Sequence, residues 1–276
     1  MNHMTHIPAR QSPAFEDLRS WLSARCGIHY PENKSDLLRQ RLARVQMAHQ
    51  LRDLEDMAHR VVQLGQHDLQ LAVMHAASTN HTYFFREREV LDTVRTTILP
   101  ILAKRSEIRI WSAACSTGEE AFTLAIMISE LLGPEALKRT TILGTDISAP
   151  VIERAEAGMF SDRQLEQLPA DIRRKYFLPR GLGQSQIRQD IRDACTFRWM
   201  NLKSQPFPFT KPFQIVFCRN ILYYFDRPDQ IATVRAIRGV TEPGGWLVTS
   251  VTENVRDLLE GWTPVASGIS QKGGAA

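Results

Sequence analysis

Four short apolar runs in the last two thirds of the 276-residue chain constrain its fold more than any other feature. They occupy residues 108–113, 141–145, 214–218 and 246–251. Helical patterns over 119–132 and 149–157 follow the first two runs. Strands alternating with helices are typical of a doubly wound, mostly parallel sheet, because each crossover helix returns the chain to the same end of the sheet. The sequence therefore predicts an α/β fold from about residue 105 onward.

The N-terminal part has a different pattern, with apolar residues at three- and four-residue spacing. Phe15, Leu18 and Leu22 follow it, and so does the segment 35–48, for which Ser35 is a suitable N-cap. Further helical patterns cover 51–64 and 68–77, and no alternating strand pattern precedes residue 105. We predict an all-helical domain with its linker over residues 1–88 and a second domain over 89–276.

One stretch of the second domain interrupts the alternation of strands and helices. Gly181 and Gly183 are followed by apolar residues at Ile187, Ile191 and Phe197. Glycines between apolar residues are typical of a hairpin. We predict a small antiparallel insertion over about residues 178–200.

The composition is that of an ordinary globular protein. It is 43% apolar and 23% charged, no apolar run approaches 18 residues, and Met1–Ser12 lacks the apolar core of a secretory signal. The four cysteines form no C-x-x-C pair, which favours reduced thiols and a cytoplasmic location. A net charge of +4 is too small to indicate nucleic-acid binding. All eight histidines lie within the first 81 residues, so no His-based triad or metal site is predicted in the later two thirds.

The segment 111–120 (WSAACSTGEE) places a turn of small residues between a strand and a helix. Small side chains let a ligand approach the backbone. Only Gly118 is glycine, so the G-x-G-x-x-G pattern of a pyrophosphate site is missing. Glu119 and Glu120 would repel a phosphate and attract a cationic ligand, although capping of the following helix alone would also explain them.

Polar residues also follow the later strands. Asp146, at the end of its strand, is placed to accept both hydroxyls of a ribose, or alternatively to cap the next helix. The segment 217–226 (FCRNILYYFD) offers Asn220 for a cofactor and aromatic residues that either border a ligand or belong to the core. The segment 79–87 (TNHTYFFRE) combines hydrogen-bonding groups and an arginine with three aromatic residues at the junction of the two domains. We expect this junction to close over a cofactor.

These segments, together with Asn201-Leu202 and the late Glu253-Asn254, resemble in order and spacing the CheR family of chemotaxis-receptor methyltransferases. The resemblance covers nearly the whole chain and implies a Rossmann-like methyltransferase sheet. It also implies the cofactor S-adenosylmethionine, the product S-adenosylhomocysteine, and methyl esters formed on glutamates in the cytoplasmic domains of chemoreceptors. It implies catalytic roles for Arg86 and Tyr224. The cofactor-binding positions carried over from the family are Asn80, Thr82, Arg86, Glu120, Asp146, Asn201, Leu202, Asn220 and Ile221.

Two regions depart from the family pattern. The region between Arg180 and Asn201 is short compared with family members that dock on a receptor tail, so tethered recruitment is not predicted. After Asn254 the chain lacks an aromatic-rich final strand, and we predict that the last strand is degenerate.

Two alternative functions stay open, a methyltransferase of another substrate class and a degenerate, cofactor-binding regulatory module. The chain has no Asn/Asp-Pro-Pro-Tyr run of the kind associated with methylation of nucleic-acid bases. We expect a monomer that binds neither nucleic acid nor metal and does not insert into membranes. Arg39, Arg41 and Arg44 form a basic cluster that either faces an acidic receptor helix or is simply solvated.

Overall fold

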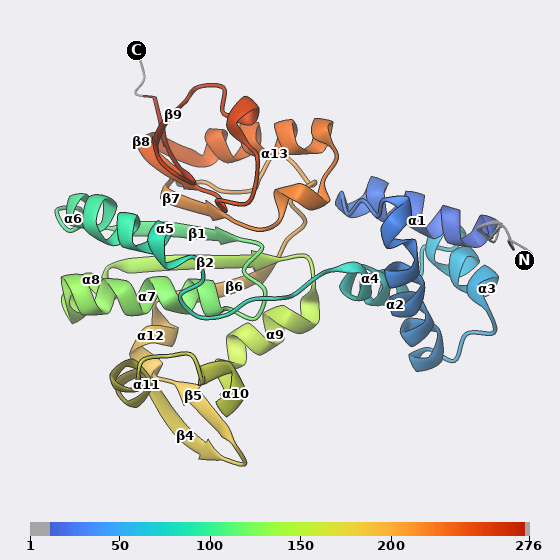
Figure 1. Ribbon diagram of the computed structural model, residues 1–276, viewed down its shortest axis with the longest axis horizontal. Helices are drawn as coiled ribbons and strands as arrows, with labels where there is room; N and C mark the ends of the chain where they lie inside the picture. The colour runs from blue at the N-terminus through green and yellow to red at the C-terminus, as the bar shows by residue number, and fades with distance from the viewer. Residues whose placement is uncertain (1–11, 274–276) are drawn as a thin grey trace, which may run out of the picture. The chain divides into compact units, whose positions relative to one another are not determined.

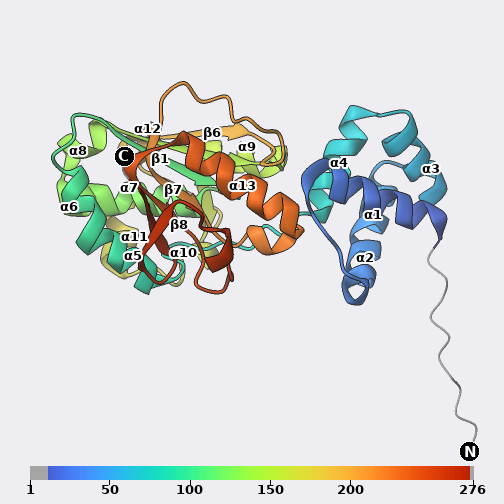
Figure 2. The same ribbon diagram turned by 90° about the horizontal axis from the view of Figure 1, so that it is seen from above.

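The computed structural model describes residues 12–273, and the chain divides into two compact units, 1–78 and 79–276 (Figures 1 and 2). Residues 79–88, which the sequence analysis grouped with the helical domain, lie in the second unit. The segment expected to lack a secretory signal lies almost wholly outside the described residues, as does the end of the Gly/Ala tail. No described helix combines the length and the apolar character that crossing a membrane requires.

The described part of the first unit is helical, as predicted. Its core is built from residues that recur on one face of each helix, among them Phe15, Leu18 and Leu22 of α1 and Leu38 and Leu42 of α2, all fully buried. Asp53 accepts the backbone N–H of Asp56 and thereby starts α3 three residues later than the helical pattern predicts. The helices are α1 (Pro13–Cys26), η1 (Glu32–Lys34), α2 (Ser35–Ala48), α3 (Leu54–Ala58), η2 (His59–Gln63) and α4 (His67–Ala77).

The basic cluster of α2 is not a uniform solvated face. The Arg41 guanidinium donates to the Ala77 and Ser78 carbonyl oxygens at 2.8 and 3.0 Å and to the Tyr30 hydroxyl at 2.8 Å. Arg39 lies over the Phe15 ring, 4.0 Å from its centroid. Arg44 is exposed, whereas Arg39 and Arg41 are partly buried. The alternative of a simply solvated cluster is therefore wrong for Arg41, which joins α2 to the end of α4. Contact of this cluster with a receptor helix stays a prediction.

Arg41→Ala is expected to destabilise the first unit by about 2 kcal/mol, because hydrogen bonds to a charged group contribute about 1.5–3 kcal/mol. Arg44→Ala, the matched control on the same helix, is expected to change the stability by less than about 0.5 kcal/mol. Urea unfolding followed by circular dichroism measures both values. Equal midpoints for the two variants would contradict this assignment of Arg41.

The second unit contains the predicted parallel sheet. Its seven strands lie in the order β6-β2-β1-β7-β8-β10-β9, and the first five are parallel (Figure 1). The strands are β1 (Ile108–Ala113), β2 (Thr140–Asp146), β6 (Cys195–Trp199), β7 (Phe213–Cys218), β8 (Thr241–Val248), β9 (Trp262–Ala266) and β10 (Ile269–Lys272). The prediction of a degenerate last strand is wrong, because β10 pairs antiparallel with β8 and with β9.

Helices cover both faces of this sheet. Successive residues of a strand point to opposite faces, where they belong to two different hydrophobic clusters. Ile215 and Phe217 pack with α7, whereas Val216 and Cys218 pack with α13. The helices of this unit are α5 (Arg88–Thr93), η3 (Val94–Ile98), α6 (Leu99–Leu102), α7 (Glu119–Leu132), α8 (Pro134–Lys138), α9 (Ala149–Ala157), α10 (Asp162–Leu165), α11 (Ala170–Tyr176), α12 (Gln189–Asp193), η4 (Leu222–Tyr224), α13 (Arg227–Val240) and η5 (Arg256–Leu258).

The antiparallel insertion exists, but its position differs from the sequence expectation. It is a three-stranded sheet of β3 (Met159–Ser161), β4 (Phe177–Gly181) and β5 (Gln184–Ile187) in the order β3-β5-β4. Residues 195–199, which the prediction assigned to the insertion, instead form β6 of the main sheet. The reason is that Phe197 of β6 is buried and packs edge-on against Phe122 of α7, with ring centroids 5.3 Å apart.

Candidate active site

The turn after β1 brings backbone groups toward the end of β2. Ala114, Ser116 and Gly118 all have positive φ angles, of 67, 50 and 93°. A Cβ atom at Gly118 would lie 3.0–3.2 Å from side-chain atoms of Phe122, Ala155 and Phe197, so glycine is required there. The Ser116 hydroxyl donates to the Asn80 carbonyl oxygen at 3.3 Å. The turn thus joins the strand end to the segment 79–87.

Asp146 is buried at the end of β2, and backbone groups hold its carboxylate. One oxygen accepts the Ser116 N–H at 3.0 Å and the other accepts the Ser148 N–H at 2.9 Å. Burial raises the pKa of the Asp146 carboxyl, and these N–H groups oppose the rise. Each oxygen keeps a second lone pair, which suits a ligand with two adjacent hydroxyls. The Met200 N–H donates to the Asp146 carbonyl oxygen at 2.9 Å and brings the Asn201-Leu202 pair to the same edge.

The two glutamates at the start of α7 have different environments. Glu119 is buried and accepts hydrogen bonds from the Thr117 hydroxyl at 2.6 Å and from the Gln164 amide at 3.2 Å. Burial raises the pKa of Glu119. Glu120 accepts the Ser112 hydroxyl at 2.6 Å and ion-pairs with Arg219 at 3.0 Å. Of these two glutamates, Glu120 is the one that contacts a residue following another strand, Arg219 after β7. Glu120 is also the one predicted to bind the cofactor.

The loop after β7 is organised by Glu253, whose role the sequence analysis did not identify. One Glu253 oxygen accepts the N–H groups of Ile221 and Leu222, both at 2.8 Å. The other accepts those of Asn220 at 3.0 Å and Ser250 at 3.2 Å. Burial raises the pKa of Glu253, and these four backbone donors oppose the rise. The carboxylate holds Asn220 at a φ of 60° and fixes where Asn220 and Ile221 lie.

Glu87 and Arg219 are two further groups that the sequence analysis missed. Glu87 accepts the Ser250 hydroxyl at 2.7 Å and the Asn220 amide at 3.3 Å, and it ion-pairs with Arg219 at 3.4 Å. Burial raises the pKa of Glu87, but these hydrogen bonds and the Arg219 charge outweigh it, so the pKa lies below its ordinary value. The segments 79–87, which ends at Glu87, and 217–226, which contains Arg219, were the available signals. The contacts themselves join residues more than 130 positions apart in the sequence, so neither segment shows them by itself.

The two candidate catalytic residues come from different segments, Arg86 from the linker 79–87 and Tyr224 from η4. The Arg86 side chain donates to the His81 carbonyl oxygen at 2.9 Å and lies 5.7 Å from the centroid of the Tyr83 ring. Tyr224 packs against the half-exposed Tyr223, with ring centroids 4.5 Å apart. Burial and the neighbouring Tyr224 raise the pKa of Tyr223, whereas the Arg86 charge lowers it, so the two segments are within electrostatic reach of each other.

Hydrogen bonds and ion pairs connect five segments: the linker 79–87, the start of α7 and the ends of β2, β6 and β7. These segments carry Asn80, Arg86, Glu120, Asp146, Asn201 and Asn220. Leu202 and Ile221 belong to the hydrophobic cluster beneath α13. Thr82 is partly buried in the same linker.

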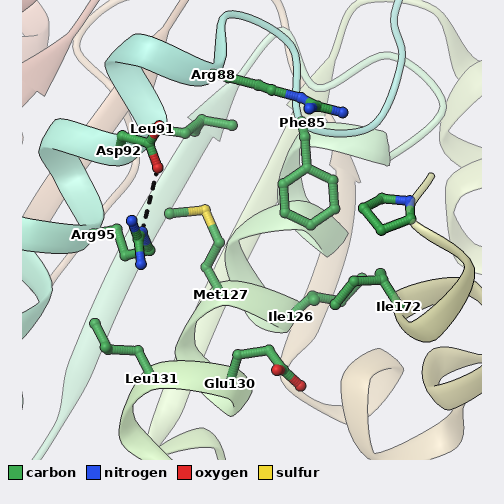
Figure 3. Close-up of a pocket in the computed structure, with 11 residues that line it drawn as sticks. Phe85, Arg88, Leu91, Asp92, Arg95, Ile126, Met127, Glu130, Leu131 and Ile172 are labelled. Atoms are coloured by element: carbon green, nitrogen blue, oxygen red, sulfur yellow. Dashed lines mark hydrogen bonds and ion pairs between the residues drawn. The ribbon is translucent and has the colours of Figure 1, made fainter. Parts of the chain in front are cut away.

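A cavity of about 520 Å³ lies outside this site, on the α5 side of α7 (Figure 3). Met127 and Ile126 form its floor, and Phe85 points into it from the linker. None of the nine candidate cofactor residues lines it. It is lined by Phe85, Arg88, Leu91, Asp92, Arg95, Ile126, Met127, Glu130, Leu131, Pro169 and Ile172.

The carboxylates at this end of the sheet are compatible with S-adenosylmethionine. The Asp146 carboxylate is an acceptor of the kind that a ribose would need, and the acidic Glu120 is a group that would suit a cationic ammonium. Arg219 is buried and its Nε has no hydrogen-bond partner among the described residues, which leaves one donor for a polar ligand or water.

Comparisons with known proteins agree with this fold. The CheR methyltransferase SAM-binding domain matches residues 80–268, and the CheR all-alpha domain matches residues 13–72. The chain is 34% identical to a chemotaxis protein methyltransferase of Borreliella burgdorferi over 65% of this chain and 66% of that one. It is 31% identical to chemotaxis protein methyltransferase 1 of Pseudomonas aeruginosa over 88% of this chain and 91% of that one. Its identity to the Escherichia coli chemotaxis protein methyltransferase is 30%, over 94% and 91%.

The fold and the matches define an S-adenosylmethionine-dependent methyltransferase. The chain belongs to the CheR methyltransferase family, and both domains of that family are present.

Proposed function

We propose that this enzyme transfers a methyl group from S-adenosylmethionine to glutamate side chains in the cytoplasmic domains of chemotaxis receptors, forming γ-methyl esters. The assembly of Glu120, Asp146 and Arg86 at one edge of a CheR-type sheet carries the proposal. Relatives named chemotaxis protein methyltransferase support the choice of pathway. The proposal includes a cytoplasmic, monomeric enzyme that meets its receptor without inserting into the membrane.

S-adenosylmethionine supplies a methyl group that its sulfonium already activates. A glutamate side chain, with an ordinary pKa near 4.3, is ionised at neutral pH, so the protein needs no general base. Positioning therefore supplies most of the rate, and alignment of reactants reaches effective molarities of about 10⁵–10⁸ M in the best cases. In this proposal Arg86 orients the glutamate carboxylate and Tyr224 borders the path of the methyl group.

The proposal assigns the cofactor contacts by the chemistry of each group. Asp146 accepts the ribose hydroxyls, and Glu120 faces the amino-acid end. Asn201, Leu202, Asn220 and Ile221 surround the base, with polar groups at its edge and apolar groups at its faces. Asn80 and Thr82 close the site from the linker.

Methyl transfer from labelled S-adenosylmethionine to a panel of receptor cytoplasmic fragments tests the substrate class. Glutamyl esters release labelled methanol in mild base, whereas methylated amines do not. Base-stable label, or label on nucleic acid only, would favour the alternative of another substrate class. Cofactor binding without transfer to any substrate would favour the regulatory module.

Arg86→Ala is expected to lower kcat for receptor methylation at least tenfold, because a hydrogen bond to a charged group contributes about 1.5–3 kcal/mol. The melting temperature should change little, since within residues 12–273 the Arg86 side chain makes its hydrogen bond and its ring contact with near neighbours in the linker, the His81 carbonyl oxygen and the Tyr83 ring. Arg88→Ala, two residues further along and exposed, is the matched control and should leave kcat unchanged. A fully active or unfolded Arg86→Ala protein would refute the role of Arg86.

A further inference from the structure

We propose that Arg219 is a positioning residue that sets Arg86 and Glu120 relative to each other across the site. The inference rests on the proposed function, in which Arg86 orients the substrate carboxylate and Glu120 faces the cofactor. Arg219 is assigned no direct contact with the reacting atoms.

The contacts of Arg219 join three separate segments. Its Nη2 donates to the Arg86 carbonyl oxygen at 2.6 Å and lies 3.4 Å from a Glu87 carboxylate oxygen. Its Nη1 donates to Glu120 at 3.0 Å. The side chain is only 3% exposed, so these interactions act with little competition from water. One guanidinium thus connects the linker, the start of α7 and the end of β7.

The neighbouring linker residues are fixed by other contacts. Phe84 packs edge-on against Phe160 and Phe177, with centroids 4.9 and 5.2 Å away. The Phe85 N–H donates to the Thr123 hydroxyl at 3.1 Å, and the Phe85 ring points into the cavity of Figure 3. Glu87, on the other side of Arg86, accepts the Ser250 hydroxyl at 2.7 Å. Because residues before and after Arg86 are held, the hydrogen bond to the Arg86 carbonyl oxygen fixes the orientation of the peptide plane beside the Arg86 side chain.

Only arginine has the geometry for this arrangement. A planar guanidinium directs donors along several fixed directions at once, whereas lysine carries a compact charge on a flexible stem. Glu87 and Glu120 place two carboxylates beside Arg219, so a lysine would keep the charge balance without holding all three partners. Arg219→Lys therefore separates the charge of Arg219 from its directional hydrogen bonds.

The first experiment measures Arg219→Lys by two independent readouts. Calorimetry should show about a tenfold loss of S-adenosylhomocysteine affinity, because Glu120 is no longer held. Receptor methylation should show kcat reduced about tenfold or more, with KM for the receptor unchanged. The calorimetric readout needs no receptor. The wild-type chain could methylate no receptor fragment while Arg219→Lys still binds S-adenosylhomocysteine more weakly. That result would contradict the proposed substrate but would still support the inference that Arg219 holds Glu120.

A double-mutant cycle shows whether Arg219 acts through Arg86. The Arg86→Ala/Arg219→Lys protein should have a kcat within about twofold of Arg86→Ala alone, because the residue being positioned is already absent. Multiplicative effects of the two substitutions would overturn the proposal.

Arg139→Lys is the matched control. Arg139 is a partly buried arginine at the other end of β2 that donates to the Ala103 carbonyl oxygen at 2.7 Å, and its Nε also lacks a partner among the described residues. This variant should keep both S-adenosylhomocysteine affinity and kcat.

Arg219→Gln provides a second variant of Arg219, and circular dichroism shows whether it is folded. Loss of fold in both Arg219 variants, or unchanged affinity and kcat in folded Arg219→Lys, would assign Arg219 a structural role only.

Discussion

Asp146→Ala is expected to weaken S-adenosylhomocysteine binding by about 3 kcal/mol or more, roughly 150-fold, because two hydroxyl hydrogen bonds to one carboxylate would be lost. The substitution also removes the acceptor for the Ser116 and Ser148 N–H groups, so the turn after β1 keeps only the backbone hydrogen bond from Cys115 to Thr145 as its link to β2 among the described residues. Both effects lower the affinity for S-adenosylhomocysteine. Isothermal calorimetry with the product measures the change without requiring a methyl acceptor.

Asp53→Ala provides the control for Asp146. Asp53 also accepts a backbone N–H, that of Asp56 at 2.8 Å, but it lies at the start of α3 in the first unit. Its substitution should cost about 1 kcal/mol of stability, as for other N-caps, and leave product affinity unchanged. If Asp146→Ala bound the product as tightly as the wild-type chain, the ribose assignment would be wrong.

The parallel sheet could be predicted because its signal is local. β1 and α7 have the predicted bounds, since a buried apolar run and a helical pattern each depend only on neighbouring residues. The strands toward the two edges of the main sheet were predicted less well. Residues 195–199 join this sheet by pairing with β2, and β10 joins it by pairing with β8. The apolar pattern of a single segment cannot identify the strand with which it pairs.

The same distinction applies to the candidate site. Asp146 and Asn220 were identified because each follows an apolar strand. Apart from the Ser250 N–H beside Glu253, the named partners of Glu87, Arg219 and Glu253 lie 31–164 positions away, so no short motif shows which groups they hold. Arg41 is the converse case, since its place in a basic helix suggested a partner protein although its guanidinium binds carbonyl oxygens of its own unit.

Glu253→Gln is expected to destabilise the second unit by about 4 kcal/mol. An amide nitrogen would replace one carboxylate oxygen, and two of the four backbone N–H donors would then face another donor, at about 1–3 kcal/mol for each unsatisfied group. For a unit of this size the melting temperature should fall by roughly 8–16 °C. Because Glu253 orders Asn220 and Ile221, product affinity should fall as well, even at temperatures where the protein remains folded.

Glu242→Gln distinguishes this effect from the general loss of a carboxylate. Glu242 belongs to β8, which ends two residues before Ser250, but its partners are the Gln214 amide at 3.1 Å and the half-exposed Arg105 at 2.9 Å. A glutamine can still accept from either, and ion pairs with exposed partners contribute at most about 1 kcal/mol. Glu242→Gln should therefore lower the melting temperature by less than about 4 °C and leave product affinity unchanged. Equal losses of melting temperature and affinity in the two variants would show that Glu253 has no special part in ordering the loop after β7. The expected outcome is that Glu253→Gln lowers both the melting temperature and the affinity for the product, whereas Glu242→Gln leaves the affinity unchanged. This outcome would identify the buried Glu253 carboxylate as the group that holds one wall of the cofactor site.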